Sequence, residues 1–287
     1  ILIFVTSGCS VLLKLALPIN HTPKPTGKND VGTKTFYITD SSRKETFTNI
    51  PDDKRRLVAQ AWYPTTQTSG ENAKHLDFFD LRLEPISNQL GIDSRLIQNI
   101  EEITTTSILD ATLEGSRELP LIIFSHGLGG FRAQNTIQFQ ELASRGYLVL
   151  SLDHPYDANI TIFQDRSIAE FKSDNREQLS EDEFWEYWLP KIETRSEDIL
   201  FLINYIEEES KDMSSFFYNR VDMQKIGVFG HSFGGGTCLY AMWKDKRIKA
   251  AAALDGWIVP VPDKVLNSGL DKPFMYIGRR NWSEPYN

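Results

Sequence analysis

The residues with the clearest chemical potential form the pentapeptide GHSFG, residues 230–234, in which one serine lies between two glycines. A short apolar run precedes it and an apolar helical pattern follows it, so the sequence predicts a strand, a tight turn and a helix. Small residues on both sides let strand and helix approach each other while the serine backbone is held at strained angles. The amide of Phe233 would lie at a helix N-terminus, where it could donate to a developing oxyanion. We therefore predict that Ser232 is the nucleophile of an acyl-transfer reaction, with a glycine-rich packing turn as the alternative.

A carboxylate that could support this nucleophile, Asp255, follows the small-residue run 248–254. We expect this run to form the strand beside that of the nucleophile. From the carboxyl end of that strand, a carboxylate can hold the activating histidine in place and balance its positive charge. Many hydrolases place this acid after a later strand, but here the next predicted strand, 273–278, is followed by Arg279 and Arg280. This arrangement favours Asp255 as the acid.

A second glycine-rich stretch, SHGLGG at residues 125–130, follows the continuous apolar run 121–124. Such a run is typical of a strand buried on both faces, and the glycines would allow the backbone to approach a ligand closely. In hydrolases with a serine turn of this kind, the loop after this strand supplies a second oxyanion donor, which we place on the amide of Leu128. The alternative is an ordinary strand-to-helix turn, and for the His126 side chain we favour a hydrogen bond to the backbone.

Two further side chains are candidate substrate contacts. His154 lies in DHPYD, residues 153–157, directly after the predicted strand 147–152. The alternative for it is a solvated histidine in a turn at the end of a strand. Trp257 lies in the segment that follows the predicted acid.

An aromatic patch, FWEYW at residues 184–188, lies in the stretch 181–209, which we predict to be mostly helical and broken by Pro190. Most patches of this kind belong to a core. A minority are lids or surfaces that contact lipid, because indole and phenol rings are favoured at a membrane boundary. Both alternatives stay open at this point.

The elements that must position these residues follow an α/β pattern. Alternating β-branched and aromatic residues at 33–39 and 57–63 predict two opening strands that pair antiparallel. The strand at 121–124, a helix at 135–145 and the strand at 147–152 predict a right-handed parallel unit. With 287 residues, the chain fits one α/β domain with a mostly parallel central sheet flanked by helices.

Composition excludes several other classes of function. The net charge of -8, without a basic stripe, argues against a nucleic-acid partner. Cys9 and Cys238 are expected to be unpaired thiols, and the five histidines lack the spacing of a metal site. We predict neither a metal nor a cofactor.

The N-terminal residues 1–17 are apolar apart from small polar groups and one lysine. They resemble the end of a transmembrane helix, or the tail of a lipoprotein signal that would precede a lipidated Cys9; a buried helix is the third alternative. The proline-containing stretch 18–27 lacks an apolar period and is predicted to be a linker. We therefore expect residues 1–26 to attach a catalytic domain, residues 27–287, to a membrane, in the cell envelope or outside the cell.

Three stretches together resemble the platelet-activating-factor acetylhydrolase family: FSHGLGGFR at 124–132 with the strand YLVLSLDH at 147–154, KIGVFGHSFGGGT at 225–237, and AAALDGWIVPVPD at 251–263. The resemblance covers residues 24–278. It implies an α/β-hydrolase fold and cleavage, without calcium, of short or oxidised acyl chains from the sn-2 position of phospholipids. It also implies that Ser232 is the nucleophile, Asp255 the triad acid, and the amides of Leu128 and Phe233 the oxyanion hole.

The sequence departs from this pattern because no histidine follows Asp255, although the fold orders its triad as Ser, Asp, His. We therefore expect the α/β hydrolase to be C-terminally incomplete, with its catalytic histidine beyond residue 287, one sheet edge unpaired and only residual activity in this segment. His154 precedes the nucleophile on another strand and His231 is expected to point away from the turn, so both are poor substitutes. Three functions remain: an esterase of phospholipids or other short-acyl esters, a general carboxylesterase or polyester hydrolase, and a catalytically silent module that binds lipid or a partner.

Overall fold

The computed structural model describes residues 20–113, 115, 117–172 and 179–278. The strands in these ranges are β1 (Asp30–Lys44), β2 (Lys54–Thr65), β3 (Asn72–Lys74), β4 (Thr104–Leu109), β5 (Leu119–Ser125), β6 (Leu148–Asp153), β7 (Ile160–Ile162), β8 (Ile168–Glu170), β9 (Val221–His231), β10 (Ile248–Leu254) and β11 (Phe274–Ile277). The helices are α2 (Phe79–Leu90), α3 (Ser94–Ile97), the short 3-10 helix η1 (Gln98–Glu102), α4 (Thr136–Ser144), α5 (Glu181–Glu209), α6 (Phe233–Lys244) and α7 (Asp263–Ser268).

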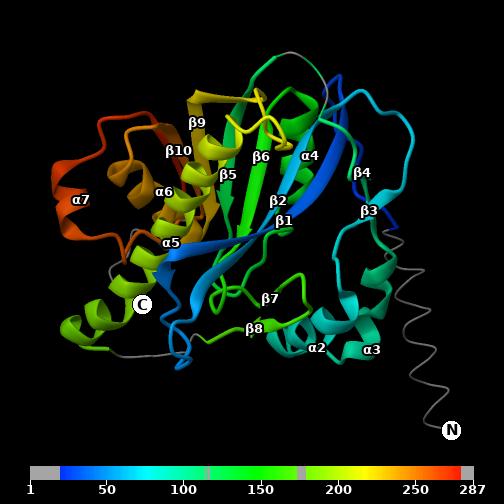
Figure 1. Ribbon diagram of the computed structural model, residues 1–287. Coiled ribbons are helices and arrows are strands. Elements are labelled where there is room, and N and C mark those ends of the chain that lie inside the picture. Colours follow the sequence, from blue (N-terminus) through cyan, green and yellow to red (C-terminus); the bar gives the residue numbers. More distant parts are fainter. Residues whose placement is uncertain (1–19, 114, 116, 173–178, 279–287) are drawn as a thin grey trace, which may run out of the picture.

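One large sheet runs through the centre of the molecule, and helices pack on both of its faces (Figure 1). Within the described ranges it has nine strands in the order β11-β10-β9-β5-β6-β2-β1-β4-β3, while β7 and β8 form a separate pair. The first five strands in this order, from β11 to β6, run parallel to one another. The opening strands β1 and β2 are antiparallel to each other, and β2 is antiparallel to β6. The predicted α/β-hydrolase arrangement, with antiparallel opening strands and a parallel unit made by β5, α4 and β6, is therefore confirmed.

Alternate residues of the central strands face two different cores. Leu121 and Ile123 of β5 belong to a core that includes residues of α5 and α6. Ile122 and Phe124, which point to the opposite face, pack with Phe139 of α4. The central strands are thus covered on both faces, which explains their continuous apolar sequences. Because these strands are parallel, the residues that follow them gather at one edge of the sheet.

The helix α5 does not break at Pro190, so that prediction was wrong. The helix is continuous from Glu181 to Glu209 and begins with a capping box between Ser180 and Glu183. Pro190 lacks the amide that would donate to the carbonyl of Glu186, and both residues are exposed. Water can hydrogen-bond that carbonyl, so the helix tolerates the proline on its solvent side.

The part of the predicted linker that the structure describes, residues 20–27, is docked on the domain through hydrogen bonds. The amide of Thr22 donates to the carbonyl of Thr104 at 2.9 Å. The hydroxyl of Thr26 donates to the carboxylate of Glu141 at 2.6 Å. Polar contacts of this kind leave no apolar period in the sequence, which is why the stretch resembled a free linker.

The membrane-like stretch at residues 1–17, with Cys9, lies outside the described residues. In the ranges that the structure does describe, no helix combines the length and the apolar character needed to cross a bilayer. Cys238 on α6 is a free, buried thiol, as predicted. At the far end of the described sheet, β11 forms an edge strand whose four residues are all exposed.

Candidate active site

Ser232 lies on a strained turn between β9 and α6. Its φ of 50° and ψ of -119° are angles that a residue with a side chain rarely adopts. Gly230 and Gly234 make the turn possible, because a Cβ on Gly230 would overlap the carbonyl of Gly234, and one on Gly234 would overlap the carbonyl of Ser125. The amide of Ser232 is fixed by a 2.9 Å hydrogen bond to the carbonyl of Leu254. The predicted strand, turn and helix are therefore present, and their geometry suits a nucleophilic serine.

Two backbone amides near this turn are available to bind an anion. Within the described ranges, no hydrogen bond is found for the amide of Phe233, at the start of α6, or for that of Leu128, in the glycine-rich loop. The amides that follow Leu128 are already used, since Gly129 donates to the carbonyl of Asp157 and Gly130 to that of Gly127, both at 2.9 Å. Unpaired amides at such positions can stabilise a developing oxyanion.

The glycine-rich loop is in contact with the serine turn. A Cβ on Gly127 would lie 2.8 Å from Nδ1 of His231 and 3.4 Å from the Cβ of Ser232. The absence of a side chain at Gly127 therefore lets the loop pack close to Ser232. This contact brings the predicted donors at Leu128 and Phe233 to the same region of the sheet edge.

Asp255 follows β10, which lies beside β9, as the sequence analysis expected. Its backbone is held by a 2.6 Å hydrogen bond from its amide to the carbonyl of Ile277. The next residues return to the serine turn, because the amide of Trp257 donates to the carbonyl of Ser232 at 2.9 Å. The carboxylate also acts on this turn electrostatically: burial lowers the pKa of His231, and Asp255 opposes that shift. The structure thus brings Ser232 and the predicted acid to neighbouring turns.

The histidine that would activate Ser232 is not found in the described part of the chain. All five histidines of the sequence are described, and no ring among them makes a hydrogen bond with the Ser232 hydroxyl. Nδ1 of His231, the ring next to the serine, is buried without a hydrogen-bond partner in the described ranges. Neither His154 nor His231 hydrogen-bonds Ser232 in this structure, and that neither of them serves as the base stays a prediction.

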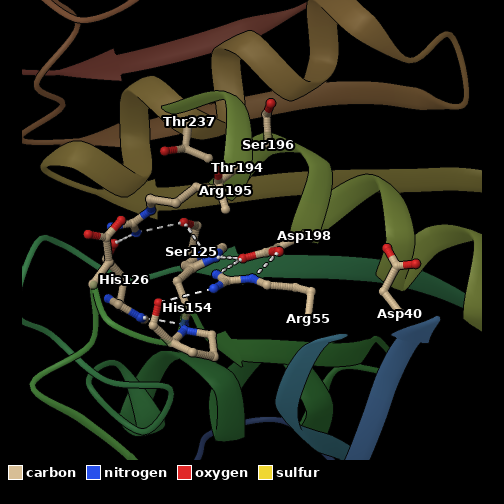
Figure 2. Close-up of polar contacts among 12 residues, drawn as sticks. Asp40, Arg55, Ser125, His126, His154, Thr194, Arg195, Ser196, Asp198 and Thr237 are labelled. Atoms are coloured by element: carbon tan, nitrogen blue, oxygen red, sulfur yellow. Dashed lines mark hydrogen bonds and ion pairs between the residues drawn. The ribbon is translucent and has the colours of Figure 1, made fainter. Parts of the chain in front are cut away.

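A different set of residues has the connectivity of a catalytic triad, and sequence reasoning missed it (Figure 2). Ser125 Oγ lies 2.9 Å from Nε2 of His154, and Nδ1 of the same ring lies 2.9 Å from Oδ2 of Asp198. All three side chains are completely buried, so a substrate cannot reach this serine. The array is therefore internal and separate from the turn of Ser232, which is only partly buried. The one signal in the sequence was a carboxylate, Asp198, on the apolar stripe of a long helix.

Electrostatics keep this array in one protonation state. Burial alone would raise the pKa of Asp198, but Arg55, at 2.7 Å, and the hydrogen bond from His154 hold it well below its usual range. Burial, followed by the positive charge of Arg195, lowers the pKa of His154 to about 3. His154 is therefore neutral at physiological pH: Nδ1–H donates to Asp198, and Nε2 accepts the hydroxyl proton of Ser125.

These contacts correct both alternatives considered for His154. A substrate contact and a solvated turn each require an exposed ring, whereas this ring is completely buried and both its nitrogens are engaged. The prediction for His126 is confirmed: Nδ1 donates to the carbonyl of Gly127 at 2.6 Å, and Nε2 accepts the amide of His154 at 3.1 Å. The rings of His126 and His154 thus both hydrogen-bond residues at the start of the glycine-rich loop.

An aromatic cluster borders the serine turn on the side of α5. The rings of Trp188 and Trp257 are 4.7 Å apart and perpendicular, and Phe184 and Phe233 pack against them. Trp188 is buried, while Trp257 is only partly buried beside Ser232. The cluster can therefore form an apolar wall next to Ser232. As for metals, the described ranges contain no group of three or more His, Cys, Asp or Glu side chains that could hold an ion.

Comparisons with known proteins agree with this geometry. A family model described as platelet-activating factor acetylhydrolase, isoform II, matches residues 18–287. The platelet-activating factor acetylhydrolase of Canis lupus familiaris is 28% identical over 284 residues, which cover 92% of this chain and 61% of the relative. A probable 1-alkyl-2-acetylglycerophosphocholine esterase of Arthroderma benhamiae is 25% identical, with coverages of 92% and 63%. The chain thus spans less than two thirds of the length of these curated relatives.

A solved structure shares the fold. The ferulic acid esterase from Streptomyces cinnamoneus superposes with a TM-score of 0.71 and 26% sequence identity, over 93% of this chain and 70% of the esterase. The sequence relatives and this structural relative are all named for the hydrolysis or removal of an ester-linked acyl group. Hydrolysis of a carboxylic ester is therefore the activity for which these three proteins are named.

Proposed function

The chain belongs to the platelet-activating factor acetylhydrolase, isoform II, family, and we propose that it is a serine esterase that hydrolyses short or oxidised sn-2 acyl esters of phospholipids. The observation that carries the proposal is the strained turn at Ser232, beside which the amides of Phe233 and Leu128 have no hydrogen-bond partner among the residues that the structure describes. Asp255 on the neighbouring turn completes the set of groups that this chemistry requires, apart from the base.

In the proposed reaction, Ser232 Oγ attacks the carbonyl carbon of the ester as the base removes its proton. The carbonyl oxygen becomes an oxyanion that accepts hydrogen bonds from the amides of Leu128 and Phe233. Collapse of this intermediate breaks the ester bond, the base returns the proton to the departing alcohol, and an acyl-serine remains. Water, activated by the same base, then releases the fatty acid and restores Ser232.

We propose that the base is a histidine that follows Asp255 in the chain and lies outside residues 1–287. The support is that all five histidines of this sequence are described and none hydrogen-bonds Ser232. The order Ser, Asp, His is the order of this fold. Asp255 would hold the ring of that histidine and balance its charge, as the sequence analysis anticipated.

The substrate class rests on the family and on the aromatic wall beside the turn. Trp257, partly buried beside Ser232, is proposed to contact the acyl chain or the lipid. The aromatic cluster that it forms with Trp188 and Phe184 suits an ester at a membrane surface.

We also propose, from the apolar pattern of residues 1–17, that the protein acts in the cell envelope or outside the cell, attached to a membrane through this segment. The likeness to a ferulic acid esterase favours a second candidate, a general carboxylesterase with another acyl pocket.

The first experiment identifies the nucleophile. In the full-length protein, Ser232→Ala should lower kcat by about 10⁶ and abolish labelling by a fluorophosphonate, which reacts with activated serines. Ser214→Ala is the matched control, because Ser214 is exposed on a distant turn. Labelling that maps to another serine, or retained turnover in Ser232→Ala, would reject the proposed site. Absence of any turnover in the wild type would instead favour the silent binding module.

The second experiment identifies the substrate. Phosphatidylcholines with sn-2 acetyl or sn-2 palmitoyl chains are presented in the same mixed micelles, and their hydrolysis rates are compared with that of a soluble feruloyl ester. We expect the acetyl lipid to be hydrolysed fastest. Equal rates on both lipids, or a preference for the feruloyl ester, would remove the phospholipid assignment and leave the general carboxylesterase.

A further inference from the structure

One completely buried group below the serine turn has no role in the mechanism above. Arg195, on α5, has no exposed side-chain surface. Burial lowers its pKa to about 10, so the guanidinium remains positively charged at neutral pH. A buried charge is costly unless its surroundings engage it, and the contacts of Arg195 show where it acts.

Arg195 binds the base of the loop that carries Leu128. Its Nη2 donates to the carbonyl oxygen of His126 and, at 3.1 Å, to the hydroxyl of Ser125 (Figure 2). Ser125 in turn donates to His154, and His154 donates to Asp198. The hydroxyl proton of Ser125 and the ring proton of His154 therefore each have one acceptor. The buried array with triad connectivity therefore fixes the orientation of the Ser125 hydroxyl, whose oxygen accepts a hydrogen bond from Arg195.

The same guanidinium touches the other side of the proposed oxyanion hole. Its Cζ lies 4.8 Å from the ring centre of Phe233, whose amide is one of the two donors. Its Nη1 lies 4.0 Å from Oδ2 of Asp157. The carbonyl of Asp157 accepts the amide of Gly129, directly after Leu128. Arg195 thus contacts the ring of the residue that carries one donor and hydrogen-bonds the base of the loop that carries the other, while its Nη1 and Nε find no hydrogen-bond partner in the described ranges.

We propose that Arg195 is a positioning residue that fixes the distance between the amides of Leu128 and Phe233. This inference rests on the proposed serine esterase mechanism. The physical reason is that the two donors come from separate segments, the loop after β5 and the first turn of α6, and an oxyanion hole works only when both point at one oxygen. A planar guanidinium can contact two segments at once, because it donates from its edge to one segment while it packs against an aromatic ring of the other.

The test compares the reaction with binding of a transition-state analogue in the full-length protein. A trifluoromethyl ketone adds to the nucleophilic serine and places its oxyanion in the hole. In Arg195→Met, kcat on a short p-nitrophenyl ester should fall by about 10², the effect of misplacing a reacting group by about 1 Å. The inhibition constant of the ketone should rise by the same factor, while KM changes little. Arg195→Lys, which keeps the charge and one donor group, should recover part of both losses.

The matched control is Arg82→Met. Arg82 is an equally buried arginine with ion-pair partners in Asp77 and Asp153, and the contacts described for it do not reach the loop or the serine turn. This variant should be less stable but should keep the wild-type kcat and ketone affinity. If Arg195→Met does not fold, Arg195→Lys carries the comparison, because it preserves the buried charge and most of the stem.

The inference is overturned if Arg195→Met folds and keeps kcat and ketone affinity within about threefold of the wild type, or, where only Arg195→Lys folds, if that variant does so. It is also overturned if kcat falls while the ketone binds as before, since the loss would then lie outside the oxyanion hole. Failure of the esterase mechanism itself is separate: Ser232→Ala would remain active or would still form the ketone adduct, whatever the Arg195 variants do.

Discussion

Mild acid should destabilise this fold through the buried ring of His154. The pKa of His154 is lowered to about 3, first by burial and then by Arg195. In the unfolded chain the same ring has a pKa of about 6.5. Between these values the unfolded state binds a proton that the folded state does not, so the free energy of unfolding falls as the pH falls below about 6.5. The loss is complete near pH 3, where the folded ring also becomes protonated.

The size of this effect follows from the two pKa values. At pH 5 the contribution of His154 amounts to about 2 kcal/mol, against a total stability of about 5–15 kcal/mol for a typical domain. Burial also lowers the pKa of His126, which adds a loss of the same sign. Asp198 contributes little to the change at pH 5, because its folded pKa is depressed and its stabilisation is lost only below the unfolded value of about 4.

The measurement isolates His154 by difference. Urea unfolding at pH 7 and pH 5 is compared for the wild type and His154→Gln, which has no titrating ring. The variant should be less stable at pH 7, because the bonds to Ser125 and Asp198 change, but it should lose about 2 kcal/mol less than the wild type between the two pH values. Ser214→Ala, at an exposed residue without a titrating side chain, is the control and should keep the wild-type pH dependence. An identical pH dependence in His154→Gln and the wild type would refute the reasoning.

Three further substitutions test the site and the scaffold. Asp255→Asn should lower kcat by about 10⁴ in steady-state kinetics with an unchanged circular dichroism spectrum, because the amide favours the wrong histidine tautomer; near-normal turnover would place the acid elsewhere. Gly234→Ala should cost at least about 3 kcal/mol in urea unfolding, because its Cβ would overlap backbone carbonyls; an unchanged midpoint would contradict this packing. Arg55→Met should cost about 3–5 kcal/mol in the same assay, because it removes the guanidinium that pairs with the buried carboxylates of Glu45 and Asp198, of which only Asp198 keeps a second arginine in the described ranges, Arg43; a variant as stable as the wild type would show that these two ion pairs contribute nothing to stability.

The serine turn could be predicted because its requirements are local. Glycines at 230 and 234, an apolar run before them and a helical pattern after them fix the strained backbone of Ser232 almost independently of the rest of the chain. The position of Asp255 was also predictable, because parallel strands bring the residues that follow them to one edge of the sheet. Continuous apolar runs identified the central strands, because both faces of those strands are covered by other elements.

The tertiary structure alone decided what lies beneath the site. Ser125, His154 and Asp198 are far apart in the sequence and come together only because α5 packs over the ends of β5 and β6. Arg195 reaches His126 and Phe233 for the same reason. Contacts of this kind leave no periodic pattern in the sequence. A buried charge is stable only where partners from other elements pair with it, and the tertiary structure alone brings those partners together. The sequence therefore determined the serine turn and the carboxylate at the end of the neighbouring strand, whereas packing determined the buried network beneath them.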